Sequence, residues 1–224
     1  MFINFHQLRK KSKAVQFCVT TAIIYLSLCT GTVYALPQMS EVVAGSADVS
    51  VNGTTMNINA ADNTIVNYNS FNIEVDESVL VRLPNEQSQM LNRVTGGDLS
   101  RLLGRLESNG LFILVNQSGI LVGSEGFIDA SKLILSTRDI MDKDFLKKNY
   151  VFSKNSKGGV DRLLLNEGEI QIKEGGFGVL IAGAVENDGL IHVPMGEVAL
   201  AGGDAVSLKL SNDGLVSVTI DKPT

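Results

Sequence analysis

The sequence predicts an all-β protein: a right-handed parallel β-helix, or single-stranded β-solenoid, with a short excursion off its coils. Three observations lead to this fold class: a repeated segment, alternation typical of strands, and turn residues between the strands. The repeat begins "NEGEI" at Asn166, "NDGLI" at Asn187 and "NDGLV" at Asn212, at spacings of 21 and 25 residues. Similarity at such a spacing is typical of solenoids.

The residues around the repeats indicate strands rather than helices. "GEVALA" and "VSLKL" alternate apolar and polar residues, which is the period of a strand. Asn and Gly tolerate positive φ and so suit the corners between strands. A coil of about 20 to 25 residues has room for three short strands. We expect Asn at equivalent corners to hydrogen-bond between coils, with "NQSGI" at Asn116 as a looser copy of the unit.

Residues 1–35 have the pattern of a secretory signal peptide. A basic start without acids precedes the apolar run "AVQFCVTTAIIYLSLC", and "VYA" places a small residue before the expected cut after Ala35. An uncleaved membrane anchor is the alternative, but the run is shorter than the roughly 20 residues that a spanning helix needs. Both cysteines, Cys18 and Cys29, lie in this segment.

Cleavage would leave residues 36–224 with 15 basic and 24 acidic side chains, a net charge of −9. This charge argues against nucleic acid as a partner, because phosphate binding requires clustered Lys and Arg. The length predicts one domain, and no later run is apolar enough to span a membrane as a helix. We expect a β-helix core over about 48–220.

Residues 137–165 interrupt the repeat pattern and carry most of the charge runs. We expect an excursion off the solenoid at about 141–162, in which "DKDFLKKN" forms one or two helical turns. A solvated face is the simpler interpretation of this segment. A partner-binding loop is the alternative, because loops on rigid scaffolds often carry function.

The segment at 92–120, "NRVTGGDLSRLLGRLESNGLFILVNQSGI", is rich in Gly and Asn. Its "GGDLSRLLG" does not match the G-x-G-x-x-G phosphate-binding pattern, and no P-loop lysine follows. "DLSRLLGRLESNG" fits both a helix and a strand, and periodicity alone leaves both open. "LFILVNQSGILVG" predicts two strands around a turn at 117–119.

This segment resembles the secretion domain of filamentous hemagglutinins and high-molecular-weight adhesins, the exported partners of bacterial two-partner secretion (TPS) systems. The matching motifs are "NRVT" at 92–95, "LLGRL" at 102–106, "NQSGI" at 116–120 and "STRDI" at 136–140. Upstream, "NYNSFNI" at 67–73 matches with Tyr68 in place of the family's tryptophan. The chain departs from the family at Gln117 and Ser118, where an asparagine-proline-asparagine-glycine-isoleucine motif is usual.

The resemblance implies a right-handed β-helix that serves as a secretion signal. It implies recognition by the periplasmic POTRA domains of an outer-membrane β-barrel transporter, followed by export to the surface or medium. The transporter-recognition residues carried over are Asn92, Arg93, Thr95, Gly96, Asn116, Gln117, Ser118, Gly119 and Ile120. We expect Asn116→Ala to weaken secretion more than it weakens the fold, and we expect unpaired edges of the early strands to offer the transporter a site for strand addition.

No residues in the sequence form a catalytic, cofactor or metal site, and we predict no enzymatic activity. His192 lies in a strand-like stretch, and no spacing pairs Asp98, Asp129, Asp139 or Asp204 as acid and base. The alternative function is that of a stand-alone surface adhesin or structural solenoid with a host-surface or cell-surface ligand. The C-terminal segment "VSVTIDKPT" is shorter than the cap that we expect at the open end of a solenoid.

Overall fold

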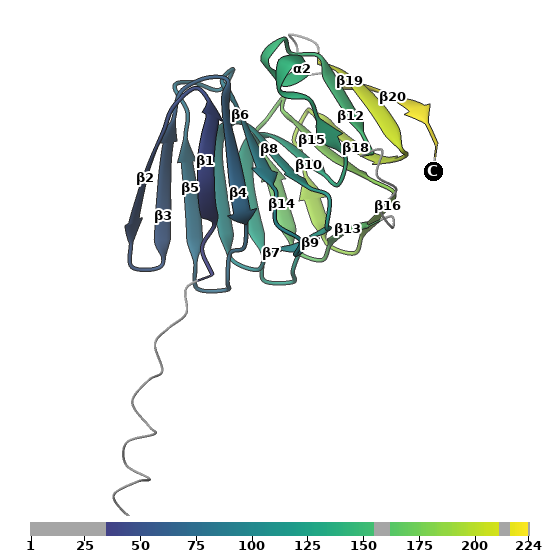
Figure 1. Ribbon diagram of the computed structural model, residues 1–224. Coiled ribbons are helices and arrows are strands. Elements are labelled where there is room, and N and C mark those ends of the chain that lie inside the picture. The colour runs from purple at the N-terminus through teal and green to yellow at the C-terminus, as the bar shows by residue number, and fades with distance from the viewer. Residues whose placement is uncertain (1–34, 155–161, 211–215, 224) are drawn as a thin grey trace, which may run out of the picture. The chain divides into compact units, whose positions relative to one another are not determined.

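The computed structural model describes residues 35–154, 162–210 and 216–223 (Figure 1). The predicted signal peptide up to residue 34, both cysteines and the repeat residue Asn212 lie outside the described residues. The described chain is almost entirely β, and its strands stack in parallel into a three-faced solenoid. The all-β fold class and the parallel β-helix predicted from the repeats are therefore confirmed.

Each face of the solenoid is a stack of strands from successive coils. The first face holds β3 (Thr55–Ala60), β5 (Ser78–Arg82), the starts of β8 (Arg105–Asn116) and β10 (Phe127–Ser136), β14 (Glu169–Ile172) and β17 (Leu190–His192). The second face holds β4 (Thr64–Ser70), β6 (Gln89–Val94), the ends of β8 and β10, β15 (Phe177–Ala182) and β18 (Glu197–Gly202). The third face holds β7 (Ser100–Leu102), β9 (Ile120–Val122), β13 (Leu163–Asn166) and β16 (Ala184–Asn187).

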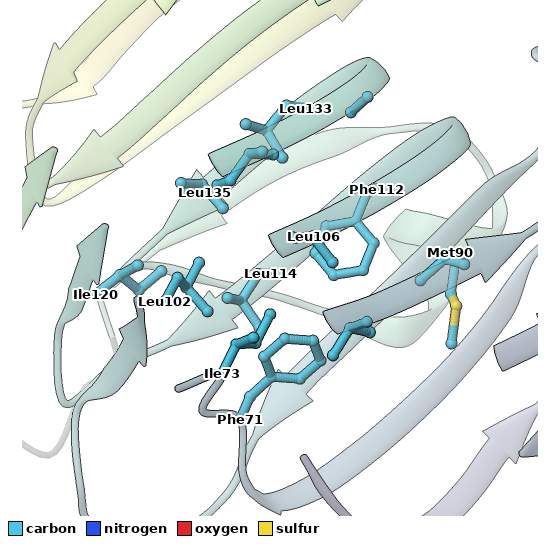
Figure 2. Close-up of a cluster of buried hydrophobic side chains, with 14 of the residues drawn as sticks. Phe71, Ile73, Met90, Leu102, Leu106, Phe112, Leu114, Ile120, Leu133 and Leu135 are labelled. Atoms are coloured by element: carbon cyan, nitrogen blue, oxygen red, sulfur yellow. The ribbon is translucent and has the colours of Figure 1, made fainter. Parts of the chain in front are cut away.

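The ambiguous "DLSRLLGRLESNG" segment forms strands and no helix. Residues 100–102 are β7 and residues 105–109 begin β8. Leu102 and Leu106 are both buried and face the inside of the solenoid, where Figure 2 shows them among aliphatic and aromatic side chains from neighbouring coils. Pairing with neighbouring coils selects the strand here: β7 pairs with β9, and the start of β8 pairs with β5. The sequence of the segment alone is compatible with a helix as well.

A column of glycines forms the corner between the third and first faces. Gly104, Gly126, Gly168 and Gly189 each immediately precede residues paired in register across the first face. A Cβ on Gly126 would lie only 2.3 Å from the carbonyl oxygen of Leu102 in the preceding coil. The glycine of the "NxG" repeat is therefore required because backbones of successive coils approach too closely for any side chain.

Two antiparallel strands cap the N-terminal end of the solenoid. β1 (Gln38–Ala44) pairs with β4, and β2 (Ala47–Asn52) pairs with β3, both antiparallel. The parallel coils begin at β3, shortly after the expected start of the core near residue 48. The same cap pairs with the outer edges of β3 and β4, and within the described residues β1 and β2 each keep one edge unpaired, so strand addition at the early strands stays a prediction.

The excursion forms a separate four-stranded antiparallel sheet, in the order β11 (Asp139–Ile140), β12 (Tyr150–Ser153), β19 (Ala205–Leu210) and β20 (Val216–Lys222). Between β11 and β12 lies the helix α2 (Asp142–Leu146), which confirms the predicted helical turn. β19 and β20 belong to this sheet rather than to a coil. The described parallel coils therefore end at β18, and β19 and β20, which lie within the expected core of about 48–220, pair antiparallel in the excursion sheet instead.

The excursion sheet covers the outer side of the second face. Ile65, Leu91, Ile113, Ile134 and Val179 are stacked in register on that outer side, and all are fully buried. From the excursion sheet and α2, the apolar side chains packed on them include Ile140, Phe145, Tyr150, Phe152, Val206 and Leu208. The charged side chains around α2, such as Lys143, Lys147 and Lys148, are exposed as the expected solvated face requires, while the apolar side chains of the excursion cover a strand face that is apolar on both sides.

Polar contacts fix the excursion sheet to the solenoid. The Tyr150 hydroxyl donates to Oε1 of the buried Gln89. Arg138, which is 3% exposed, donates from Nε to the Gly203 carbonyl at 2.7 Å and contacts Asp204 at 3.4 Å. These contacts join residues more than 60 positions apart in the chain, so the second layer is set by tertiary structure rather than by local sequence.

The C-terminal end of the solenoid exposes part of its apolar interior. In the described residues, β16, β17 and β18 each pair only with a strand of the preceding coil. Val198 and Leu200 are in register with the inward-facing Gly178 and Leu180, yet they are 46% and 50% exposed. The last coil therefore presents unpaired strand edges and core side chains, as the open end of a solenoid does.

Replacement of a corner glycine should destabilise the solenoid. We expect Gly126→Ala to lower the free energy of unfolding by about 2 kcal/mol, because the added methyl group would collide with the Leu102 carbonyl. Gly97→Ala is the matched control, since a Cβ there meets nothing within 4 Å. Urea unfolding monitored by circular dichroism measures both, and equal losses would contradict the close-approach explanation.

Alkaline pH should loosen the excursion through Tyr150. Burial, and then the negative charge of Asp62, raise the pKa of Tyr150 to about 12. A folded-state pKa above the unfolded value of 10 contributes stability below pH 10 that is lost as pH rises towards 12. We expect the unfolding free energy of Tyr150→Phe to fall less than that of the wild type between these pH values. Identical pH slopes in denaturant titrations would contradict this role.

Candidate functional site

The two motifs expected to carry the secretion signal meet at one corner of the solenoid. "NRVT" ends β6 in one coil, and "NQSGI" follows β8 in the next coil. Arg93 pairs with Val115 and Val94 pairs with Asn116 in the parallel ladder. Residues 22 positions apart in sequence are thus stacked one coil apart, at the corner between the second and third faces.

Asn92 lies inside the solenoid rather than on its surface. It is fully buried in a row of apolar side chains, in register with Val66 and Leu114. Its amide nitrogen donates to the Ile113 carbonyl at 3.2 Å, and its oxygen accepts from the Tyr68 hydroxyl at 3.1 Å. Burial raises the pKa of Tyr68, which keeps the hydroxyl neutral and able to donate. Asn92 and Tyr68 therefore provide each other with a hydrogen-bond partner within the core.

Arg93 points the other way and joins the motif to the excursion. Its guanidinium donates to Asp139 at 2.8 Å and to the Ile140 carbonyl at 2.6 Å, and it forms an ion pair with Asp142 at 2.7 Å. Burial works to lower the pKa of Arg93, but the two carboxylates outweigh it and raise the pKa overall. "NRVT" and the "STRDI" motif, which ends at Ile140, are thereby held together.

Thr95 and Gly96 fasten the corner to the preceding coil. The backbone nitrogen and the hydroxyl of Thr95 both donate to the Tyr68 carbonyl, at 2.8 and 3.1 Å. A Cβ on Gly96 would lie 2.0 Å from the Asn69 carbonyl oxygen. The family motif therefore requires glycine here because two backbones are in contact.

Asn116 organises the turn in the following coil. Its side chain is fully buried and donates to the Asp98 carbonyl and to the Ser100 hydroxyl, both at 3.0 Å. Its side-chain oxygen accepts from the Ser118 backbone nitrogen at 2.8 Å, and its carbonyl accepts from the Gly119 nitrogen at 3.1 Å. These hydrogen bonds hold the turn closed. In the usual family motif a proline at the position of Gln117 would restrict the backbone of the turn instead.

The remaining turn residues differ in exposure. Gln117 is exposed and Ser118 is partly exposed, whereas Ile120 is 2% exposed and packs in the core. Gly119 has φ of 116°, a conformation that residues with a Cβ rarely adopt. Of the nine residues predicted for recognition, the buried Asn92, Asn116 and Ile120 shape the corner, and Gln117 and Ser118 are open to a partner.

The repeat asparagines lie at a different corner, so "NQSGI" is not a copy of that unit. Asn166 and Asn187 are paired in register at the ends of β13 and β16, where the third face turns into the first. Asn166 donates to the side-chain oxygen of Asn187 at 2.7 Å, which confirms the expected bond between coils. The resemblance of "NQSGI" to "NEGEI" reflects similar turn residues rather than equivalent places in the coil.

The structure brings no catalytic group together from the acidic residues considered in the sequence. Asp139 is paired with Arg93, and Asp204 contacts Arg138, Lys154 and Lys222. Asp98 and Asp129 belong to other parts of the coils. Within the described ranges, no three His, Cys, Asp or Glu side chains are grouped to hold a metal ion, and no helix is long and apolar enough to cross a membrane.

Sequence reasoning missed the apolar surface beside the turn. Ser118, Gly119 and Ile120 line a hollow of about 300 Å³ together with residues of β7, β9 and β13 and the adjoining Leu99 and Arg162. The leucines of "DLSRLLG", "GILVG" and "RLLLN" could have indicated this surface. Each segment has adjacent apolar residues, whereas a strand with one buried side needs them only at alternate positions.

Loss of the Arg93 guanidinium should release the excursion. We expect Arg93→Met to lower the unfolding free energy by about 1 to 2 kcal/mol and to speed proteolysis at 141–154, because Asp139 and the Ile140 carbonyl lose their donor. Arg82→Met is the control: its ion pair with Glu107 is far more exposed, and a change below about 0.5 kcal/mol is expected. Equal proteolysis of the two variants would rule out the proposed link.

Comparison with known proteins agrees with these features. The chain is 32% identical over 212 residues to a heme/hemopexin-binding protein of Haemophilus influenzae strain Rd, covering 89% of this chain and 23% of that protein. A second heme/hemopexin-binding protein of Haemophilus influenzae is 31% identical over 155 residues, which is 66% of this chain and 16% of that protein. The chain thus spans less than a quarter of the length of these relatives.

A solved structure and a family model give the same result. The crystal structure of the HMW1 secretion domain from Haemophilus influenzae superposes with a TM-score of 0.80 at 30% identity, covering 84% of this chain and 50% of that one. The family model of the TPS secretion domain matches residues 34–220, which include both motifs at the corner and most of the excursion sheet. The chain therefore belongs to the family of TPS secretion domains, which mark exoproteins for export across the outer membrane to the cell surface or medium.

Proposed function

We propose that this chain is recognised by the periplasmic POTRA domains of a dedicated outer-membrane β-barrel transporter and exported through it. The observation that supports this function is the meeting of "NRVT" and "NQSGI" at one corner, in adjacent coils. Asn116 bonds the two coils together there, while Gln117 and Ser118 remain accessible. A buried scaffold beneath an accessible turn is the arrangement expected of a recognition signal.

The architecture also suits passage through a narrow pore. The only cysteines of the chain lie in the predicted signal peptide, so disulfides cannot trap the exported part in the periplasm. Contacts in a solenoid are mainly between neighbouring coils, so coils can form one after another as the chain emerges. The antiparallel β1 and β2 would protect the first coils once they fold outside.

The names of the relatives raise the question of a surface ligand, which is independent of the export signal. The two relatives carry heme/hemopexin binding in their names, but this chain corresponds to less than a quarter of each. The family model of a secretion domain matches residues 34–220, so most of the part aligned with the first relative is secretion domain. We therefore assign the export signal, and not the ligand of these relatives, to the described residues.

A secretion assay tests the proposed function. The full chain is expressed in a Gram-negative host with and without the partner transporter, and its amount in medium and periplasm is measured. We expect the protein in the medium only when the transporter is present. A folded chain that stays in the periplasm despite the transporter would refute the function.

The turn at Asn116 should matter for export beyond its part in stability. We expect Asn116→Ala to cost about 1 to 2 kcal/mol of unfolding free energy, because it strands buried groups at Asp98 and Ser100, and to reduce secretion severalfold. Asn166→Ala removes an equally buried amide at another corner and should cost similar stability with little effect on secretion. Equal secretion of the two variants would show that the motif acts only through the fold.

A further inference from the structure

A row of outward-facing positions begins the second face, and one of them is a lysine. Gln89 and Lys132 are each in register with Leu111, from the coils on either side of it. Phe177 continues the row in the coil after Lys132, because the residues that follow these two are paired. Residues two positions apart in a strand point to the same side, so these side chains face outward as Ile134 does. Gln89, Leu111 and Phe177 are buried, whereas Lys132 is partly exposed.

A hollow of about 400 Å³ lies over this row, beside the excursion sheet. Its opposite wall consists of residues 148–150, which follow α2 and enter β12, and of residues 208–210 at the end of β19. Tyr150 and Leu208 are in register, so the two segments lie side by side. Gln87 completes the rim. We call this hollow the Lys132 pocket, and its volume lies in the range of pockets for small ligands, roughly 300 to 1,000 Å³.

The charge around the Lys132 pocket is opposite to that of the chain as a whole. Lys132, Lys148 and Lys209 line it, and they come from three separate segments. In the part of the chain that the structure describes, none of the three forms an ion pair, in contrast to Lys173, which pairs with Glu86. A hollow lined by one sign of charge concentrates ions of the opposite sign. On a chain that would carry a net charge of −9 after signal cleavage, this pocket therefore favours an anion.

The carboxylates near the pocket have other partners. Lys173, by its hydrogen bond and its charge, lowers the pKa of Glu86, and the charge of Lys132 adds to this effect. Asp62 accepts from the Gln89 backbone nitrogen at 2.8 Å. Among the described residues, neither carboxylate forms an ion pair with a lysine of the pocket, so an anion from outside the chain can neutralise these lysines.

Lys148 has a backbone conformation that favours a different residue. Its φ is 56°, in the left-handed region where helices commonly end on glycine. Its nitrogen donates to the Phe145 carbonyl at 2.9 Å, and the Asn149 nitrogen donates to the Asp144 carbonyl at 2.8 Å, which fixes this conformation after α2. The Asp144 carboxylate accepts from the Asn149 amide at 3.2 Å, so it too has a partner other than Lys148. Glycine would adopt this conformation with less strain, so the fold does not require a lysine here.

We propose that the Lys132 pocket binds an acidic sugar, whose carboxylate or sulfate groups pair with Lys132, Lys148 and Lys209. The ammonium group of lysine is a compact point charge that fits either kind of anion. Beneath the lysines, the side chains of Leu111 and Phe177 line an apolar floor, against which the carbon–hydrogen face of a sugar ring packs.

The polar rim adds a group for the hydroxyls of the sugar. Gln87 is exposed, and within the described residues its side-chain amide has no hydrogen-bond partner. The side chain of Gln89, by contrast, accepts from the Tyr150 hydroxyl and donates to Asn63 at 2.6 Å, which holds the floor in place. Charged groups at the rim, an apolar floor and an available amide are the combination that a small polar ligand needs.

This inference goes beyond the export signal and concerns the chain after export. The pocket exists only once the excursion sheet covers the second face, because its lining comes from residues 87, 89, 111, 132, 148–150, 177 and 208–210. Export delivers the domain to the cell surface or medium, where the folded chain meets such a sugar. The corner formed by "NRVT" and "NQSGI" takes no part in the pocket, so the two roles can be tested separately.

Calorimetric titration of the purified full chain tests the pocket. The probes are a sulfated heparin disaccharide and sialyllactose, which carries a carboxylate, and lactose is the uncharged control. We expect at least one acidic probe to bind with a Kd below about 1 mM and lactose to show no binding. The acidic probe that binds more tightly tells sulfate recognition from carboxylate recognition.

Two substitutions remove charge from the pocket. We expect Lys132→Gln and Lys148→Gly each to weaken binding of that probe about tenfold, and the loss to shrink at high salt. Lys148→Gly should leave the thermal midpoint unchanged or raise it, because glycine suits a φ of 56°. Lys147→Gln is the matched control: it removes the adjacent charge, which does not line the pocket, and binding should stay within about twofold of the wild type.

The outcomes separate a defined pocket from general attraction between charges. If neither acidic probe binds, or if Lys147→Gln weakens binding as much as Lys148→Gly does, the proposal is refuted. Binding of lactose as tight as that of the acidic probes would overturn the role of the lysines. Because these measurements use purified protein, their result is independent of the secretion assay that tests the export function.

Discussion

The parallel register between coils is the constraint on which this structure depends. Adjacent strands are about 4.8 Å apart, so each residue lies directly over its counterpart one coil away. Apolar residues then form continuous rows inside, such as Met90, Phe112 and Leu133 (Figure 2). At the corner before the first face, the same spacing presses backbone on backbone, and only glycine fits. Core, corners and motif positions all follow from this stacking.

The second face shows how the solenoid gains a second layer. Its strands are apolar on both sides, and the outer side would be a large exposed patch without the excursion sheet. Residues 139–153 close it together with β19 and β20 from a distant part of the chain. Arg93 ties this layer to the "NRVT" motif through Asp139 and Asp142. One family motif therefore supports both the recognition corner and the cover of the face beside it.

The recognition corner separates structural residues from accessible ones. Asn92 and Asn116 form their hydrogen bonds inside the solenoid, where an unpaired amide would destabilise the fold. Gln117 and Ser118, which replace the usual proline and asparagine of the family motif, lie at the surface and make the turn depend more strongly on Asn116. The hollow beside the turn, lined by Leu99, Gly119 and Leu163, places apolar surface next to these accessible residues.

The class of fold and the corner residues can be predicted from the amino-acid sequence alone, because strand alternation and the "NxG" repeat are local patterns. Asn166 and Asn187 bond between coils as their spacing indicates, and "DKDFLKK" contains the helical turn. Three features become visible only in the folded chain: "DLSRLLGRLESNG" forms strands, Asn116 lies at a different corner from Asn166, and β19 and β20 leave the solenoid. These outcomes depend on which strands pair across 20 to 60 residues, as between β12 and β19. No local pattern of residues encodes such pairing, since its energy comes from ladders and buried surfaces that exist only once the coils have stacked.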